Sequence, residues 1–457
     1  MNKLWSIAPL IKKIQQPGII AYFIKKASIA FVIQVTGIGL GYLLQVFLAR
    51  VMGTQEYGLF TYIFVWSTIC AVICNLGIPL AVLRFIPHYI TKGNWGLFQG
   101  VIRGSSKLTV TVSIMMSFVL TFAALLLNYY SYLENLVPIL FGIWLVPLLA
   151  LENLQCNLFR GSSKMVAAYG PSKVLRPLLF IAGTGAMLLW AGSQKLTAQL
   201  VFIITIITYV ILILSQQVLI HKNLLNQGET ATPIYQFRSW LRVSLPLLLI
   251  IGFIIISNQT SIVMIGALLD PVQVGIYNAA TKTSYLASFV YIAVEAIAAP
   301  TIASLYTAGD QSQLQKVVTT MAHLVFWPTM LVTLFLILFS NYILRMFGSE
   351  FLAAQSSLVI LAVGQLVNSA TGPVGYMLDL TGHQDQSARV RCFTAITNFL
   401  LNYFLIPKFG IMGAAIATSI VVILDNLIIY FLAVKYTGVH ASIFSHYTLN
   451  FINKKKS

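Results

Sequence analysis

The chain has 457 residues, of which 58% are hydrophobic and only 9% are charged. Soluble globular domains carry roughly 25% charged residues, so this composition excludes a soluble globular protein and predicts an integral membrane protein surrounded by membrane lipids. The formal net charge is +17, but the cations lie between apolar runs, which favours a membrane protein over a nucleic-acid-binding protein.

The chain begins with a segment, residues 1–27, that combines lysines with aromatic and aliphatic residues. It lacks the short apolar core and the small-residue cleavage site of a secretory signal peptide. We therefore expect an amphipathic segment on the anionic cytoplasmic leaflet.

Twelve later stretches are apolar over the roughly 20 residues that a helix needs to cross a bilayer. They are expected near 28–49, 58–80, 105–127, 136–158, 172–191, 196–220, 241–266, 278–303, 318–339, 354–378, 389–406 and 411–436. A polar interruption divides them into two sets of six. The predicted divisions are an N-lobe (28–220), a cytoplasmic inter-lobe linker (221–240), a C-lobe (241–436) and a basic cytoplasmic tail (437–457).

The distribution of Lys and Arg sets the expected orientation. With a cytoplasmic N-terminus, only five of the 28 Lys and Arg residues fall outside the membrane, and 23 fall inside. This asymmetry follows the positive-inside rule and supports an even number of spans with both termini in the cytoplasm. The five external cations are Arg50, Lys195, Lys282, Arg345 and Lys408.

Two short patterns recur between the halves. Gly58-Leu59-Phe60 follows the first span, and Gly275-Ile276-Tyr277 follows the seventh, 217 positions later. A second pair, around Gly161 and Gly382, is offset by 221 positions. The similar offsets predict two repeats of the same orientation, an arrangement typical of transporters with a substrate site between the lobes.

No catalytic or nucleotide-binding motif is present. The sequence lacks HExxH, GxSxG, GxxxxGK[ST] and a GxGxxG in a strand–helix context. The histidines have no metal-ligand spacing, and the cysteines form no CxxC pair. We expect no metal and no cofactor, with energy drawn from H⁺ or Na⁺ coupling or from substrate supply and removal.

Four stretches, in order along nearly the whole chain, carry a family resemblance. They are Ala49–Phe60, Asn75–Phe85, Asp270–Ala280 and Ile406–Thr418. With them the chain resembles the polysaccharide transporters of the MATE/oligosaccharide-flippase (MOP) superfamily, the Wzx-type lipid-linked oligosaccharide flippases.

The resemblance implies an all-α membrane fold of two six-helix lobes related by pseudo-two-fold symmetry, as in MATE transporters. It implies alternating access and a cationic central cavity for a polyprenyl-diphosphate-linked oligosaccharide. The expected location is the bacterial inner membrane, and the expected partners are polysaccharide polymerase or glycosyltransferase machinery.

Cations near or within spans are candidates to bind a diphosphate. Arg84 either anchors the second span or faces phosphate. Arg160 and Arg176 are either loop anchors or cavity cations, and Lys282 is an unusual cation on the outer side. Arg50 is expected to be a structural loop residue that binds helix-end carbonyls.

Acidic and amide side chains within spans form the second group of candidates. Glu152, Glu295 and Asp425 either take up a proton or Na⁺ or pair with a structural Arg. The amides either line the sugar path or form interhelical hydrogen bonds. They are Gln34, Gln45, Asn258, Gln259, Asn398 and Asn402.

Two other functions compete with a flippase. A MATE-type cation-coupled drug antiporter would need acidic residues in its N-lobe spans, where this chain has only Glu152 against many cations. A membrane enzyme is disfavoured by the short external loops and the internal repeat. The sign of the charge therefore favours an anionic cargo.

Overall fold

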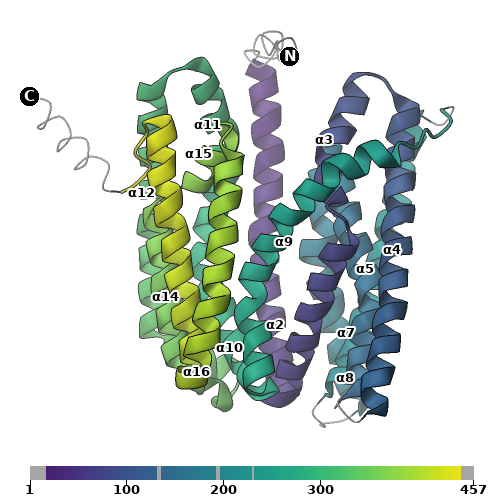
Figure 1. Cartoon of the computed structure of the whole chain (residues 1–457), viewed down its shortest axis with the longest axis vertical. Coiled ribbons are helices and arrows are strands. Elements are labelled where there is room, and N and C mark those ends of the chain that lie inside the picture. Colours follow the sequence, from purple (N-terminus) through teal and green to yellow (C-terminus); the bar gives the residue numbers. More distant parts are fainter. Residues whose placement is uncertain (1–16, 131–134, 192–195, 229–230, 444–457) are drawn as a thin grey trace, which may run out of the picture.

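The computed structural model describes residues 17–130, 135–191, 196–228 and 231–443, so most of the expected N-terminal segment and basic tail lies outside the described residues. Every regular element within these ranges is a helix (Figure 1). The helices before the inter-lobe linker are α2 (Pro17–Cys74), α3 (Ile78–Thr91), α4 (Trp95–Tyr129), α5 (Leu136–Gly161), α6 (Met165–Tyr169), η1 (Gly170–Leu175), α7 (Arg176–Ala191) and α8 (Ala198–Asn223).

The second half of the chain continues in the same way. Its elements are η2 (Leu225–Gly228), α9 (Phe237–Leu268), α10 (Pro271–Ser284), η3 (Tyr285–Ser288), α11 (Phe289–Ala308), α12 (Gln311–Leu338), α13 (Ser340–Phe347), η4 (Ser349–Ala354), α14 (Gln355–Ala370), α15 (Val374–Leu380) and α16 (Gln384–Thr437). All of these are helical, which confirms the all-α fold predicted from the sequence.

Nine helices in the described ranges are long and apolar enough to cross a membrane. Two of them, α2 and α16, contain a non-helical glycine, Gly53 (φ 76°) and Gly410 (φ 56°), where the chain reverses and crosses again. Positive φ angles of this kind favour glycine because it has no Cβ. The interrupted segment α10–η3–α11 supplies one more crossing, so the twelve expected spans are present.

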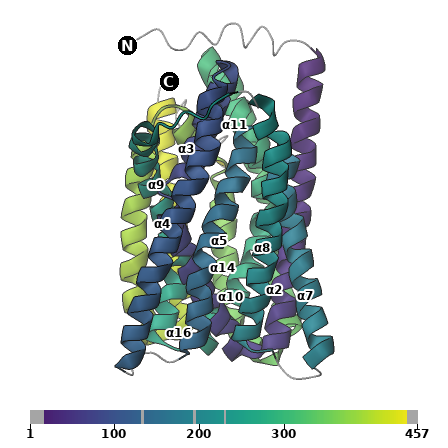
Figure 2. The same cartoon turned by 90° about the vertical axis from the view of Figure 1, so that its right-hand side faces the viewer.

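The helices form two bundles (Figures 1 and 2). One contains α3–α8 and the other α10–α16. The first part of α2 stands between the bundles, and α9 runs obliquely from one to the other. Near its start, α9 packs against the first bundle, because the backbone of Gly77 lies against Ser244 and Leu248. Farther along, the Asn398 amide on α16 donates to the Ser257 carbonyl of α9 (2.7 Å).

The two bundles stand apart at the end where α2 begins and α16 ends, which we call the terminal end (upper in Figure 1). They meet at the opposite, far end through α2 and α10. A Cβ added to Gly58 would lie 1.7 Å from the Pro271 carbonyl oxygen, and one added to Gly275 would lie 2.6 Å from the Thr54 carbonyl oxygen. Helix backbones approach this closely only where glycine leaves room.

Polar contacts extend this helix crossing. The Asn278 amide donates to the Tyr57 hydroxyl (2.7 Å), which donates to Gln45 (2.7 Å). The Thr54 hydroxyl donates to the Glu350 carboxylate (2.6 Å). We call this contact surface the far-end seal. Its members are Thr54, Tyr57, Gly58, Gly275, Asn278 and Glu350.

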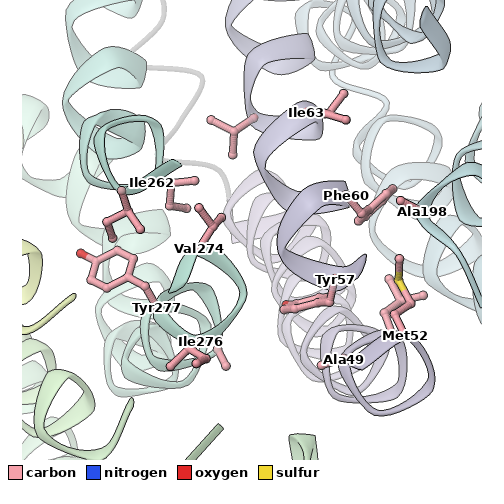
Figure 3. Packing of buried hydrophobic residues seen from close by; sticks show 14 of the residues in the cluster. Ala49, Met52, Tyr57, Phe60, Ile63, Ala198, Ile262, Val274, Ile276 and Tyr277 are labelled. Carbon is pink, nitrogen blue, oxygen red and sulfur yellow. The ribbon is translucent and has the colours of Figure 1, made fainter. Parts of the chain in front are cut away.

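Apolar packing continues the contact between the halves. Figure 3 shows Tyr57 of α2 on the side toward α10, where Val274 and Tyr277 lie in the same buried hydrophobic cluster. Asp270 caps α10 because its side chain accepts a hydrogen bond from the backbone N–H of Gln273 (2.8 Å), and Pro271 is the first residue of the helix. The start of α10 is therefore fixed by its own sequence.

Arg50 also joins the halves at the far end. Its guanidinium donates to the carbonyl oxygens of Arg345 and Met346, each at 3.4 Å, in the last turn of α13. This confirms the expectation that Arg50 is a structural residue that binds helix-end carbonyls.

Candidate functional site

Three neighbouring cavities lie on the terminal side of the far-end seal, and Lys282 lines all three. Two of them lie between the bundles, and the third is enclosed by helices of the second half. The C-half chamber, about 570 Å³, is walled by α9, α10, α14 and α16. The N-half chamber, about 380 Å³, lies between α2, η1, α7 and α10. The deep chamber, about 250 Å³, reaches toward the seal and is lined by Gln45, Thr61, Arg176 and Asn278 among others. Shared lining residues show that the three chambers are neighbours.

Lys282 and Lys173 are cations of this cavity, and only Lys173 has a carboxylate near it among the described residues, because Glu152 acts on it electrostatically. Lys282 lies in the last turn of α10 and is half-buried. Lys173 lies on η1 and is exposed to the N-half chamber. Neither ammonium makes a hydrogen bond or an ion pair with a residue that the structure describes. An unpaired charge at membrane depth is costly, so it marks a functional site by default.

Arg176 is the third cation and lines both the N-half and the deep chambers. Its guanidinium donates to the Tyr209 hydroxyl (2.9 Å) and lies 5.8 Å from the centroid of that ring. This contact holds the guanidinium in place. Because the Tyr209 side chain is uncharged, it does not neutralise the positive charge of Arg176. Arg176 is thus a positioned cation.

The local fold of the fifth span brings Lys173 and Arg176 to the cavity. Gly170 and Pro171 begin the π-helical turn η1, which interrupts the helix just before Arg176. The backbone of η1 packs on α2, where a Cβ at Gly37 would lie 2.7 Å from the Lys173 Cβ. Lys173 was not among the sequence candidates. Its three-residue separation from Arg176, on one side of a helical turn, is the signal that could have identified it.

The other two candidate cations lie outside the three chambers. Arg84 is exposed on α3. Arg160 lies in the last turn of α5, where it donates to the side-chain amide oxygen of Asn157 (2.9 Å) and lies over the Tyr169 ring at 5.8 Å. These contacts correspond to the loop-anchor alternative for Arg160.

The acidic candidates are separated in the fold. Asp425 lines the C-half chamber and accepts a hydrogen bond from Thr394 (3.0 Å). Glu152 is half-buried on α5, outside the chambers, where it interacts electrostatically with Lys173 and Arg176. The side chain of Glu295, on α11, lies outside the described residues.

The amide candidates fall into two groups. Gln45 lines the N-half and deep chambers, and Asn258 and Gln259 line the C-half chamber. Asn398 and Asn402 are buried instead, and Asn402 donates to the Asn398 carbonyl (2.8 Å), which extends the bond to α9. This is the interhelical alternative. Gln34 is half-buried on α2 and lines none of the three chambers.

The C-half chamber contains a further charged pair that the sequence did not single out. Arg391 lines this chamber, and its guanidinium lies 3.4 Å from the Asp379 carboxylate. The pair is partly exposed, so its net contribution to stability is small. Its effect on the chamber is to neutralise the charge of Arg391.

Comparison with known families decides the classification. The family described as "Polysaccharide biosynthesis protein" matches residues 23–306, more than half of the chain. This chain belongs to the polysaccharide biosynthesis protein family. The MatE family also matches residues 246–404. These two family matches confirm the resemblance of the sequence to the MOP superfamily.

Two curated relatives of this family member have names that indicate transport. One, from Haloferax volcanii, is named probable low-salt glycan biosynthesis flippase Agl15. It is 29% identical over 164 residues, which cover 35% of this chain and only 34% of the relative. The other, from Shigella flexneri, is named putative O-antigen transporter. It is 24% identical over 414 residues, 86% of this chain and 93% of the relative.

A solved structure confirms the fold. An inward-facing multidrug resistance MATE transporter of the MOP superfamily superposes with a TM-score of 0.73 at 14% identity, covering 91% of this chain and 98% of that one. This member of the polysaccharide biosynthesis protein family is therefore a multi-pass membrane protein with a MATE-like transporter fold.

Proposed function

We propose that this protein flips a polyprenyl-diphosphate-linked oligosaccharide from the cytoplasmic to the outer leaflet of the bacterial inner membrane by alternating access, for polysaccharide biosynthesis. The observation that carries the proposal is the position of Lys282, a cation without a counter-ion among the described residues, at the meeting point of the three chambers. With Lys173 and Arg176 it forms a cationic centre between the bundles.

A diphosphate fits this centre for electrostatic reasons. Its anionic oxygens accept charge-assisted hydrogen bonds, which are about twice as strong as neutral ones. The ligand also supplies a counter-charge for Lys282, which is half-buried and has no ion-pair partner among the described residues. A drug cation, the cargo of the competing MATE-type proposal, would be repelled by the same centre.

The cavity and the seal together support one half of a transport cycle. If the terminal end is cytoplasmic, as the positive-inside rule predicts, the cavity lies toward the leaflet in which the substrate is made. Opening of the far-end seal and approach of the bundles at the terminal end would then release the substrate outward. Only differential binding energy can bias such an exchange.

The energy source is part of the proposal. Asp425, on the wall of the C-half chamber, is the carboxylate best placed to take up H⁺ or Na⁺ during the cycle. Its hydrogen bond from Thr394 orients it toward the chamber wall. Glu152 is a second candidate through its electrostatic contact with Lys173 and Arg176.

A flipping assay tests the proposed function. Purified protein is reconstituted into proteoliposomes that carry the lipid-linked oligosaccharide fraction of the source organism, and glycan exposure on each leaflet is followed with a membrane-impermeant lectin. We expect protein-dependent movement of the glycan, and no uptake of the organic cation ethidium. Ethidium uptake without glycan movement would overturn the proposal in favour of the drug antiporter.

A further inference from the structure

The two larger chambers differ in chemistry. Among the described residues, the N-half chamber is lined by Lys173, Arg176 and Lys282 and by no carboxylate, and Glu152 acts on Lys173 and Arg176 from outside it. In the C-half chamber, Arg391 is paired with Asp379, and Asp425 adds a carboxylate to the wall. The positive potential is therefore concentrated on the N-half side, and the C-half side is close to neutral.

Amides dominate the polar wall of the C-half chamber. They come from three helices, α9, α14 and α16, and so surround the space. Each amide offers both donors and acceptors. The five are Asn258, Gln259, Gln365, Asn368 and Asn426.

Some of these amides are fixed in place and others are free to bind. Gln365 accepts from Ser288 (2.7 Å), and Asn426 donates to the Val422 carbonyl (2.8 Å). In contrast, Asn258 and Gln259 have no hydrogen-bond partner among the residues described, although both line the chamber. A wall of fixed and free amides suits a neutral ligand that is dense in hydroxyl groups.

Tyrosine rings complete the wall. Tyr285 lines both the C-half and the N-half chambers, and Tyr291 lines the C-half chamber. A tyrosine presents an apolar face and a polar tip, which matches the alternating C–H faces and hydroxyl edges of a sugar ring. An apolar lipid tail in the same place would leave the amides unpaired, at a cost of desolvation for each one.

We propose that the C-half chamber is the glycan subsite and that the diphosphate lies at Lys282, Arg176 and Lys173; this assignment rests on the proposed function. Lys282 and Tyr285 line both chambers, so a diphosphate at Lys282 places the first sugar, which is bonded to it, at the entrance of the C-half chamber. The chamber volume of about 570 Å³ is within the usual range of roughly 300–1,000 Å³ for ligand sites. Selectivity for the glycan then depends on α9, α14 and α16.

Two probes that differ only in the glycan test the assignment. One is the lipid-linked oligosaccharide fraction of the source organism, and the other is the same polyprenyl diphosphate with a methyl group in place of the glycan, so that the two diphosphates carry the same charge; this second probe is called the bare diphosphate. Dissociation constants are measured with the full-length protein in lipid nanodiscs. The wild-type protein is expected to bind the glycan-bearing probe more tightly.

The variants separate the two subsites. We expect the double substitution Asn258→Ala with Asn368→Ala to weaken the glycan-bearing probe about tenfold, the loss of a few net hydrogen bonds, and to leave the bare diphosphate unchanged. Lys282→Ala is expected to weaken both probes by the same factor. Asn341→Ala, at an exposed amide on α13, is the matched control and should change neither.

The possible results separate a failure of the glycan subsite from a failure of the proposed flippase function. Equal affinity of the wild-type protein for both probes, or an equal loss of both in the double variant, would overturn the glycan subsite and leave the flippase intact. Failure of the wild-type protein to bind either probe would overturn the flippase itself, and the subsite with it. Unchanged binding of both probes by the double variant would also reject the subsite.

Discussion

Gly58 and Gly275 contact each other backbone to backbone where α2 crosses α10 at the far end of the molecule. They are also the first residues of the two triplets that recur 217 positions apart. The recurring pattern therefore marks the place where the two halves touch. This contact closes one end of the cavity and leaves Lys282 on the other side of the closure.

The closeness of this crossing gives a prediction for stability. In Gly58→Ala the added Cβ would overlap the Pro271 backbone, which cannot move aside as a flexible side chain can. Overpacking of this kind typically costs about 1–3 kcal/mol, so we expect a lower thermal unfolding midpoint in detergent. Gly39→Ala is the control, because nothing lies within 4 Å of its added Cβ. Equal midpoints for the two variants would contradict the contact.

The hydrogen bonds of Tyr57 give a prediction for the seal. Tyr57→Phe keeps the ring but removes the acceptor for Asn278 and the donor to Gln45. Because a buried group left unpaired costs about 1–3 kcal/mol, we expect the seal to open more often.

Thiol labelling measures this opening. A cysteine is introduced at Thr61, which lines the deep chamber, in protein from which the native cysteines have been removed. This cysteine should react faster with an impermeant reagent applied from the far side when Tyr57→Phe is present than when Tyr57 is intact. Tyr62→Phe, whose hydroxyl has no hydrogen-bond partner among the described residues, is the control. Identical labelling rates in Tyr57→Phe and Tyr62→Phe would argue against the seal.

The positions of Lys173 and Arg84 lead to opposite predictions. Lys173 lines the N-half chamber, whereas Arg84 is exposed on α3 outside it. We expect Lys173→Ala to weaken binding of polyprenyl diphosphate about tenfold, the value of one lost charge-assisted hydrogen bond, and Arg84→Ala to remain within about twofold of wild type. A larger loss of binding in Arg84→Ala than in Lys173→Ala would show that Arg84 binds the phosphate, which is one of the two roles that the sequence left open for it.

Asp425 gives a test of coupling. If it takes up a proton or Na⁺ during the cycle, Asp425→Asn should make flipping in proteoliposomes insensitive to an imposed H⁺ or Na⁺ gradient. Asp385→Asn, an exposed carboxylate in the first turn of α16, is the matched control and should preserve the gradient response. A gradient response in Asp425→Asn equal to that of wild type would remove Asp425 from the proposed mechanism.

Much of the fold could be predicted because its determinants are local. A run of roughly 20 apolar residues forms a membrane helix wherever it occurs, and glycine at Gly53 and Gly410 allows the sharp reversals between adjoining spans. The path of α9 was less accessible. Its first turns pack on Gly77 and its later turns on Asn398, and these contacts depend on residues far apart in the sequence.

The site was harder to predict than the fold because position in the sequence does not give depth in the cavity. Arg160, Lys173 and Arg176 all lie near one expected loop, yet Arg160 binds Asn157 while the other two line the N-half chamber. The π-helical turn at Gly170 and Pro171 makes this distinction. Asn398 and Asn258 look equally suited to a sugar path, and only the structure separates the interhelical bond from the free amide.

The most direct test of the cationic centre is a charge series at Lys282 in the flipping assay. Lys282→Arg keeps the charge and is expected to retain most of the wild-type rate. Lys282→Gln, which removes the charge, should reduce the rate about tenfold, and Lys282→Glu, which reverses it, should reduce the rate more than Lys282→Gln does. Lys316→Gln, at an exposed lysine on α12, should not change the rate. A Lys282→Glu protein that is folded and flips the lipid-linked oligosaccharide at the wild-type rate would contradict the central claim that cations between the bundles hold the diphosphate.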